Sequence, residues 1–511
     1  MFQLLTDPLT VKTAQRRIAG LIARHAEWFC TQGPGEAQAL RRNEIQVEIV
    51  HGRLVLTCWT DRGSRSWRIL GWRWNGQVLS LQASRRMGAE LLLIDLIPRA
   101  SAASISATIR AARQIRCDLL ARLAAKVSLD ATIERSALSP GVRRGQPGKY
   151  ARIVLRRKLQ RIAVTASVVP SRPSSVDAYL SSALLWFRRT AERVRPPYIE
   201  QLWLIVSSDL LRSALNRIAL LRESLQSIVR IFLVDDDLTL LSPISSPERS
   251  ELWKKRLARF PPVVPADIGQ TVQKMIDLAP EAIDVVHARH GETIRYLGLP
   301  FARVRSVLGV ERVWFGREGS HRCLLDESTA VEFRNLLRDL FEHRSAEAPD
   351  HRHALYHSAP EAWLESLLRH DITKLDPGLI IAPLHAQFRT ARGGKLGSRP
   401  IDMLALRRDG RLVVIELKVS EDREHVLQGA DYWRRVEAHR RRGHISRAML
   451  FGDRAIKDES PLVYLVAPTL RVHPSFQTLA RFIASDIEIY RFDINEDWRS
   501  GVRVMRRMKA N

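Results

Sequence analysis

Two short apolar runs in the C-terminal third, Ile401 to Leu406 and Leu412 to Leu417, are separated by the sequence Arg-Arg-Asp-Gly-Arg. This pattern predicts two antiparallel strands joined by a tight turn at 408–410, in which the glycine supplies a positive φ. A three-residue turn sets the register so that Asp402 lies directly opposite Glu416. A two-residue turn would place the same two carboxylates on opposite faces. The length of this turn therefore decides whether the two acids meet.

Directly opposed residues have Cβ atoms roughly 4.5–5.5 Å apart, so Asp402 and Glu416 can hold one divalent cation, Mg²⁺ or Mn²⁺. Lys418 lies two residues beyond Glu416 and on the same face, where its ammonium can approach an attacking water or a scissile phosphate. Two carboxylates and a lysine around a cation are typical of phosphodiester hydrolysis. Gln428 and Tyr432 are four residues apart on a predicted helix, so they share a face directed toward this site.

This set of residues resembles the PD-(D/E)XK nuclease superfamily. Asp402 stands where that family has its first acidic residue, although Ile401 precedes it where the family motif has proline. Glu416-Leu417-Lys418 matches the ExK element, and the stretch Gln428 to Tyr432 matches the QxxxY element of RecB-like members. The resemblance covers about the last third of the chain and implies a restriction-endonuclease-like αβββαβ core, a divalent metal and cleavage of nucleic acid.

The segment Pro360 to Leu368 resembles the helix that opens this core in the family, where a glutamate often joins the metal ligands. Glu361 and Glu365 are one helical turn apart, and the choice between them stays open, with Glu365 favoured. The resemblance thus implies Asp402, Glu416 and Glu365 as metal ligands.

The composition is consistent with a nucleic-acid partner. The net charge of +26 over 511 residues points to a polyanion, and the N-terminal third carries the densest positive charge. The four cysteines show no CxxC or CxxH spacing, which gives no basis for a zinc site or a disulfide framework. There is no secretory signal pattern and no apolar run of about eighteen residues, so we expect a cytoplasmic protein that does not enter a membrane.

The rest of the chain predicts a multidomain α/β and α+β protein. Residues 1–140 read as a basic, β-rich domain with flanking helices, and its tryptophans, among them Trp59, Trp67 and Trp72, form either its core or a base-stacking surface. The Pro- and Gly-rich segment Ser136 to Lys149 is expected to be a linker.

Residues 150–345 predict a Rossmann-like α/β region, because a strand at Gln201 to Val206, a helix and a strand at Ile228 to Val234 follow one another. The acids Asp235 to Asp237 then form either a turn or a cation site. Without a Gly-rich phosphate loop, no nucleotide cofactor is indicated. The third predicted domain comprises residues 355–511 and contains the nuclease-like core.

We therefore predict a Mg²⁺- or Mn²⁺-dependent nuclease that acts on DNA more than on RNA, in the manner of defence or repair enzymes. One alternative is a catalytically silent nucleic-acid-binding component with the same fold. Another is a nuclease gated by a ligand bound to the middle region. A homo-oligomer or a partner protein, the cleavage mode and any sequence preference stay open.

Overall fold

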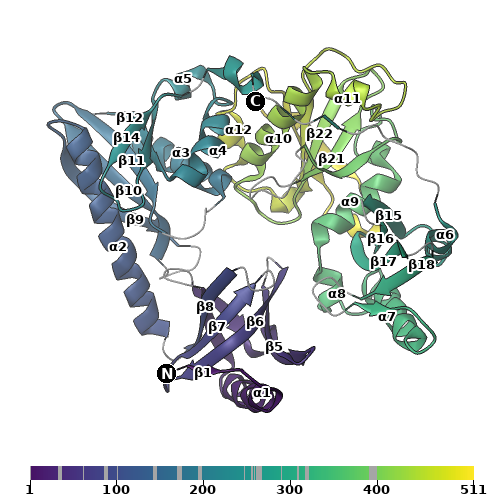
Figure 1. Cartoon of the computed structure of the whole chain (residues 1–511). Coiled ribbons are helices and arrows are strands. Elements are labelled where there is room, and N and C mark those ends of the chain that lie inside the picture. The colour runs from purple at the N-terminus through teal and green to yellow at the C-terminus, as the bar shows by residue number, and fades with distance from the viewer. Residues whose placement is uncertain are drawn as a thin grey trace. The chain divides into compact units, whose positions relative to one another are not determined.

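The computed structural model describes residues 2–511 except 33–36, 61–62, 86–89, 100–101, 142–146, 170–174, 194–197, 247, 255–256, 258, 261–267, 289–290, 308–309, 317–321 and 391–399. Over these residues the chain is a mixed α/β protein with twelve α-helices and four sheets (Figure 1). It forms two compact units. The first comprises Met1–Ser175, Thr190–Leu211 and Val229–Ile244, and the second comprises Val176–Arg189, Arg212–Ile228 and Ser245–Asn511. The division into domains 1–140, 150–345 and 355–511 stays a prediction.

The first unit opens with an eight-stranded antiparallel sheet and one helix. The strands are β1 Gln3–Leu4, β2 Glu27–Gln32, β3 Ala37–Arg41, β4 Ile45–Val50, β5 Arg53–Thr60, β6 Gly63–Trp74, β7 Leu79–Arg85 and β8 Glu90–Pro98. Helix α1, Pro8–Ala23, begins at Asp7, whose side chain accepts hydrogen bonds from two backbone N–H groups of the first turn. Its apolar residues pack on the sheet together with Trp67 and Trp72, whereas Trp59 is 37% exposed. Trp67 and Trp72 are therefore core residues, as the first of the two interpretations predicted.

A six-stranded sheet follows, with the order β14-β13-β12-β11-β10-β9. Its strands are β9 Thr132–Pro140, β10 Pro147–Arg157, β11 Gln160–Ser167, β12 Ile199–Val206, β13 Val229–Val234 and β14 Leu241–Ile244. The helices along this stretch are α2 Ala102–Val127, α3 Val176–Arg193, α4 Ser208–Ile218 and α5 Glu223–Gln226. Strands β11, β12 and β13 are parallel, which confirms the parallel pairing predicted for the strand, helix and strand of the middle region.

The linker expected in this region needs correction, whereas for Asp235 the turn interpretation is the one observed. The predicted linker contains the end of β9 and the start of β10, which pair with each other, while 142–146 lie outside the described residues. Its prolines are tolerated because β9 is an edge strand and because Pro147 is the first residue of β10. Asp235 accepts hydrogen bonds from the backbone N–H groups of Thr239 and Leu240, so this acid holds a turn.

In the second unit, a five-stranded antiparallel sheet is followed by the C-terminal sheet. The first has strands β15 Ile283–Ala288, β16 Gly291–Tyr296, β17 Leu299–Val307, β18 Val310–Phe315 and β19 Cys323–Leu324, with helices α6 Gln270–Ile276 and α7 Ala330–His343. The second has strands β20 His385–Phe388, β21 Ile401–Leu406, β22 Leu412–Leu417, β23 Leu462–Pro468, β24 Ile489–Ile494 and β25 Val504–Lys509 in that spatial order. Strand β22 is antiparallel to β21 and parallel to β23.

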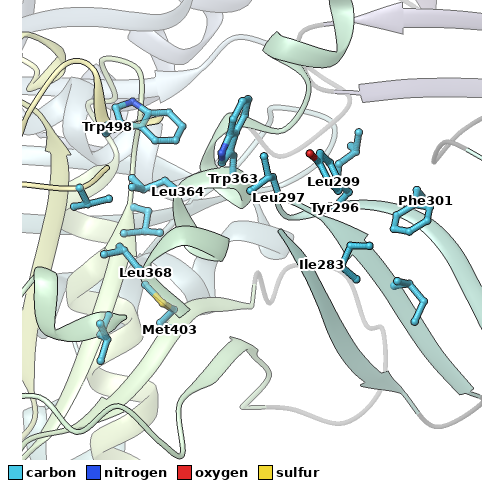
Figure 2. Close-up of a cluster of buried hydrophobic side chains, with 14 of the residues drawn as sticks. Ile283, Tyr296, Leu297, Leu299, Phe301, Trp363, Leu364, Leu368, Met403 and Trp498 are labelled. Carbon is cyan, nitrogen blue, oxygen red and sulfur yellow. The ribbon is translucent and has the colours of Figure 1, made fainter. Parts of the chain in front are cut away.

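Five helices accompany the C-terminal sheet, namely α8 Ala354–His357, α9 Pro360–His370, α10 His425–Arg440, α11 His444–Arg447 and α12 Phe476–Ala480. One apolar core joins this sheet to the five-stranded one. Figure 2 shows Leu364 and Leu368 of α9 beside Met403 of β21, and Trp363 of α9 close to Leu297 in the β16–β17 turn. Helix α9 is therefore shared by both sheets. Across the described residues, no helix has the length and apolar character needed to span a bilayer.

Candidate functional site

The β21–β22 hairpin has the predicted register. Met403 pairs with Ile415 and Leu406 pairs with Leu412, and Gly410 in the turn has a φ of 83°. The same register places Asp402 opposite Glu416, and the backbone N–H of Leu417 donates to Asp402 Oδ2 at 2.8 Å. The register prediction is therefore confirmed.

Both carboxylates lie on the face of the sheet that α10 covers. Leu404 and Val414 belong to the apolar cluster that contains Tyr432 of α10. Because alternate residues of a strand point to the same face, Asp402 and Glu416 point toward α10 as well. The hairpin and α10 thus bring together the acidic pair and the QxxxY segment, as predicted.

Glu416 is the most enclosed group of the site, with none of its surface exposed. Its Oε1 accepts a 2.6 Å hydrogen bond from Lys418 Nζ, whereas its Oε2 has no hydrogen-bond donor among the described residues. Burial, followed by the neighbouring Asp402 carboxylate, raises the pKa of Glu416 well above its ordinary value, and a proton on Glu416 would be shared with Asp402.

The pKa values of Asp402 and Lys418, the other two charged groups of the cluster, are also shifted by burial and by the neighbouring charges. Burial raises the pKa of Asp402, although Lys418 and the Leu417 N–H act in the opposite direction. Burial alone would lower the pKa of Lys418, but Glu416 and Asp402 outweigh it, so this pKa is raised. With both acids ionised and Lys418 protonated, the cluster carries one uncompensated negative charge in a largely dry position.

Helix α10 supplies three polar side chains to this face. Gln428 Nε2 donates to Tyr432 Oη at 2.8 Å, and burial, followed by Glu416, raises the pKa of Tyr432. Gln428 Oε1 is buried without a donor among the described residues. His425, which sequence reasoning missed, lies 3.2 Å from the Glu416 carbonyl oxygen through Nε2, and burial and Lys418 lower its pKa to about 3. His425 is therefore neutral at neutral pH and can donate to that carbonyl.

Glu365 approaches the acidic pair from α9, whose apolar residues pack on the other face of the sheet. Its Oε1 accepts hydrogen bonds from Arg295 at 3.1 and 3.2 Å, and its Oε2 accepts one from Gln387 Nε2 at 2.6 Å. Burial raises the pKa of Glu365 most, Arg295 lowers it, and Asp402 contributes a smaller increase. Glu365 is thus within electrostatic reach of Asp402 but hydrogen-bonded to other groups.

Glu361 also acts on the site, because its charge raises the pKa of Asp402. Its side chain is half-buried and makes no ion pair within the part of the chain that the structure describes. Both helix glutamates therefore lie near Asp402, and the choice between them as a metal ligand stays open.

Arg295 and Gln387 were not identified from the sequence. Arg295 lies on a different sheet and 70 residues before its partner Glu365, so no local motif connects the two. Gln387 has a φ of 49°, in the left-handed region, which a sequence of His-Ala-Gln-Phe does not indicate. Neither residue carries a signal that sequence analysis could have used.

A divalent cation fits the chemistry of the acidic pair. The Oε2 of buried Glu416, which has no hydrogen-bond donor in the described part of the chain, and the adjacent Asp402 carboxylate are hard oxygen ligands, and a cation in place of the proton on Glu416 would stabilise both acids in their ionised form. Among the described residues, no three His, Cys, Asp or Glu side chains converge with the spacing of a complete metal site. The pair would thus provide two ligands, with Glu361 or Glu365 nearby.

No protein family, curated protein or solved structure matches this chain.

Proposed function

We propose that this protein is a metal-dependent nuclease of the PD-(D/E)XK type, hydrolysing phosphodiester bonds in DNA in preference to RNA. The observation that carries the proposal is the buried cluster of Asp402, Glu416 and Lys418 on two paired strands, with an unpartnered carboxylate oxygen at its centre. The element order α9, β20, β21, β22, α10 and β23 supports it, because this is the αβββαβ order that the resemblance implies.

The proposed roles follow from the contacts. Asp402 and Glu416 would hold Mg²⁺ or Mn²⁺, with Glu361 or Glu365 as a further anionic group. When bound, the cation would supply Lewis-acid chemistry, making a water more acidic and neutralising charge on the phosphate. Lys418, which is protonated beside Glu416, can orient the attacking water and stabilise negative charge on the phosphoryl oxygens. Gln428 and Tyr432 close the α10 side of the site.

Nucleic acid is the substrate that the charge of the chain favours. A net charge of +26 gives a long-range attraction for a polyanion, and the phosphate backbone is what Lys and Arg side chains bind without sequence preference.

A cleavage assay tests the proposal. The protein is incubated with duplex DNA and with RNA, with Mg²⁺ or Mn²⁺. The Asp402→Ala and Lys418→Ala variants are expected to lose at least about a hundredfold in rate. Asp409→Ala is the matched control, because Asp409 is exposed in the turn of the same hairpin and should cut like the parent. If Asp402→Ala and Lys418→Ala also cut like the parent, the assignment is wrong.

One observation favours the silent alternative. Lys418 already forms an ion pair with Glu416, so the cluster is partly neutralised without a metal. A nucleic-acid-binding protein that keeps this fold without turnover would bind DNA but not require Mg²⁺ or Mn²⁺ at the acidic pair. Metal titration separates the two functions, since the nuclease must bind the cation at Asp402 and Glu416.

A further inference from the structure

A buried ionic network connects the five-stranded sheet to the candidate site. Arg295 of β16 is 5% exposed and bridges two acids. Its Nε and Nη2 donate to Asp284 Oδ1 at 2.8 and 2.7 Å, while Nη1 and Nη2 donate to Glu365 Oε1. A planar guanidinium is suited to such a bridge, because it presents several donors in one fixed fork.

Asp284 fixes the other end of Arg295. It is the direct partner of Arg295 in the β15–β16 ladder. It also accepts hydrogen bonds from Ser366 Oγ at 2.9 Å and Arg369 Nη1 at 2.8 Å, both on α9. The guanidinium is therefore held by one acid on its own sheet while it holds another on α9.

The packing around the network leaves little freedom between the sheet and the helix. Leu297 and Trp363 lie close together in the shared core (Figure 2). A Cβ on Gly298 would lie 1.9 Å from the backbone oxygen of Ala362, so the β16–β17 turn lies directly against the start of α9. Arg344, fully buried, donates to the carbonyl oxygen of Leu297 at 2.8 Å. The position of Arg295 relative to Glu365 is thus fixed by backbone contact.

The second carboxylate oxygen of Glu365, Oε2, is connected to the acidic pair through Gln387. It accepts the hydrogen bond from Gln387, and by the β20–β21 register Gln387 lies opposite Asp402. Gln387 adopts a left-handed backbone conformation within a strand, which a non-glycine residue keeps only when its surroundings hold it there. Both oxygens of Glu365 are therefore held, one from β16 and one from the strand beside Asp402.

We propose that Arg295 is a positioning residue of the candidate active site, holding Glu365 in the orientation in which it serves as the helix glutamate of the metal site. This proposal rests on the proposed function. On this proposal the five-stranded sheet contributes one residue, Arg295 of β16, to the support of the candidate active site. Arg295 would act through Glu365, as groups behind metal ligands commonly orient those ligands.

The test measures Mn²⁺ affinity by calorimetry in the full-length protein. Arg295→Met should weaken Mn²⁺ binding by about tenfold or more. Arg295→Lys keeps the charge but cannot fork between two acids, so it should recover only part of the affinity. Arg369→Met is the matched comparison, because Arg369 binds the same Asp284 and acts on Glu365 through its charge without a hydrogen bond to it, and it should weaken Mn²⁺ binding less than Arg295→Met does.

A double-mutant cycle separates positioning from general destabilisation. If Arg295 acts through Glu365, the Arg295→Met/Glu365→Gln variant binds Mn²⁺ no more weakly than Glu365→Gln alone. Additive losses, or an Arg369→Met loss as large as that of Arg295→Met, would overturn the proposal. Thermal unfolding checks each variant, and if Arg295→Met does not fold, Arg295→Lys enters the same cycle.

The same titration distinguishes two kinds of failure. If Asp402→Asn abolishes Mn²⁺ binding while Glu365→Gln leaves it unchanged, Arg295 is not a positioning residue but the proposed nuclease site stands. If Asp402→Asn binds Mn²⁺ like the parent, the proposed function itself fails, and the positioning role fails with it.

Discussion

The buried carboxylate of Glu416 needs a neighbouring group that compensates its charge. A carboxylate with no exposed surface is strongly disfavoured unless a positive charge or a proton compensates it. Lys418 compensates one oxygen, and the second oxygen has no donor among the described residues. Because the pKa of Lys418 is raised, its ammonium keeps its proton at neutral pH. In the proposed nuclease, Lys418 would therefore orient the water and stabilise negative charge rather than remove a proton from the water.

A buried histidine pair provides a test by pH. His439 Nε2 lies 3.0 Å from the Thr390 carbonyl oxygen and must donate to it, so Nδ1 accepts from His444 Nδ1 at 3.1 Å. A second proton on His439 would break this pairing, and burial lowers its pKa from 6.5 to about 4. The unfolded chain then binds more protons in this window, so the free energy of unfolding falls as the pH falls from about 6.5 to about 4.

We expect His439 to account for up to about 3 kcal/mol of this fall in the free energy of unfolding of the parent. The His439→Gln variant should lack this contribution. Urea unfolding at several pH values measures it. His351→Gln, at an exposed histidine, should keep the slope of the parent. An unchanged slope in His439→Gln would show that this histidine does not govern acid stability.

The hairpin turn determines the site through its register, and Gly410 determines the turn. Its φ is 83°, and a Cβ there would lie 2.8 Å from the Ala455 carbonyl oxygen. Gly452 also has a positive φ, of 62°, but faces open space. The two glycines therefore share a backbone requirement and differ in steric contact.

Gly452→Ala should destabilise the protein by about 1 kcal/mol, the cost of a left-handed alanine. Gly410→Ala should cost about 1–3 kcal/mol more, since it adds a clash with the backbone. Chemical denaturation compares the two variants. Equal losses would mean that the contact with Ala455 can relax freely, and that the turn does not constrain the hairpin as described.

Elements with a strong local pattern were predictable from the sequence. The apolar strands β21 and β22 and the helix α9 lie within a few residues of their predicted positions, and α10 contains the predicted helical pair Gln428 and Tyr432. Elements with a weaker local pattern were not predictable from the sequence. Strand β25 carries mixed apolar and basic residues and was missed. The apolar run Leu379 to Phe388 forms only a bridge at Leu379 and the short strand β20, because Pro383 between them has no N–H to donate.

The same division applies to the candidate site. Asp402, Glu416, Lys418, Gln428 and Tyr432 lie within one hairpin and the following helix, so spacing alone could relate them. Arg295 and Gln387 reach Glu365 through tertiary packing, which has no counterpart in local spacing. Sequence analysis thus predicted the acidic pair but not the groups that hold the helix glutamate.

At the scale of the whole chain, the candidate site depends on segments far apart in sequence. The second unit joins Val176–Arg189 and Arg212–Ile228 to the C-terminal residues. Arg217 pairs with Asp177 at 2.5 Å and with Asp431 of α10 at 3.3 Å. Burial alone would raise the pKa of Asp431, but Arg217 and Arg434 hold it well below its ordinary value. Helix α10 is therefore held by residues of α3 and α4.

Direct measurement of Mn²⁺ binding to the purified full-length protein tests the central claim, which is that Asp402 and Glu416 form one cation site. The parent is expected to bind Mn²⁺ in a calorimetric titration, and Asp402→Asn and Glu416→Gln should each weaken binding by about tenfold or more, while Asp409→Asn binds like the parent. Equal affinity in all four proteins would contradict the account.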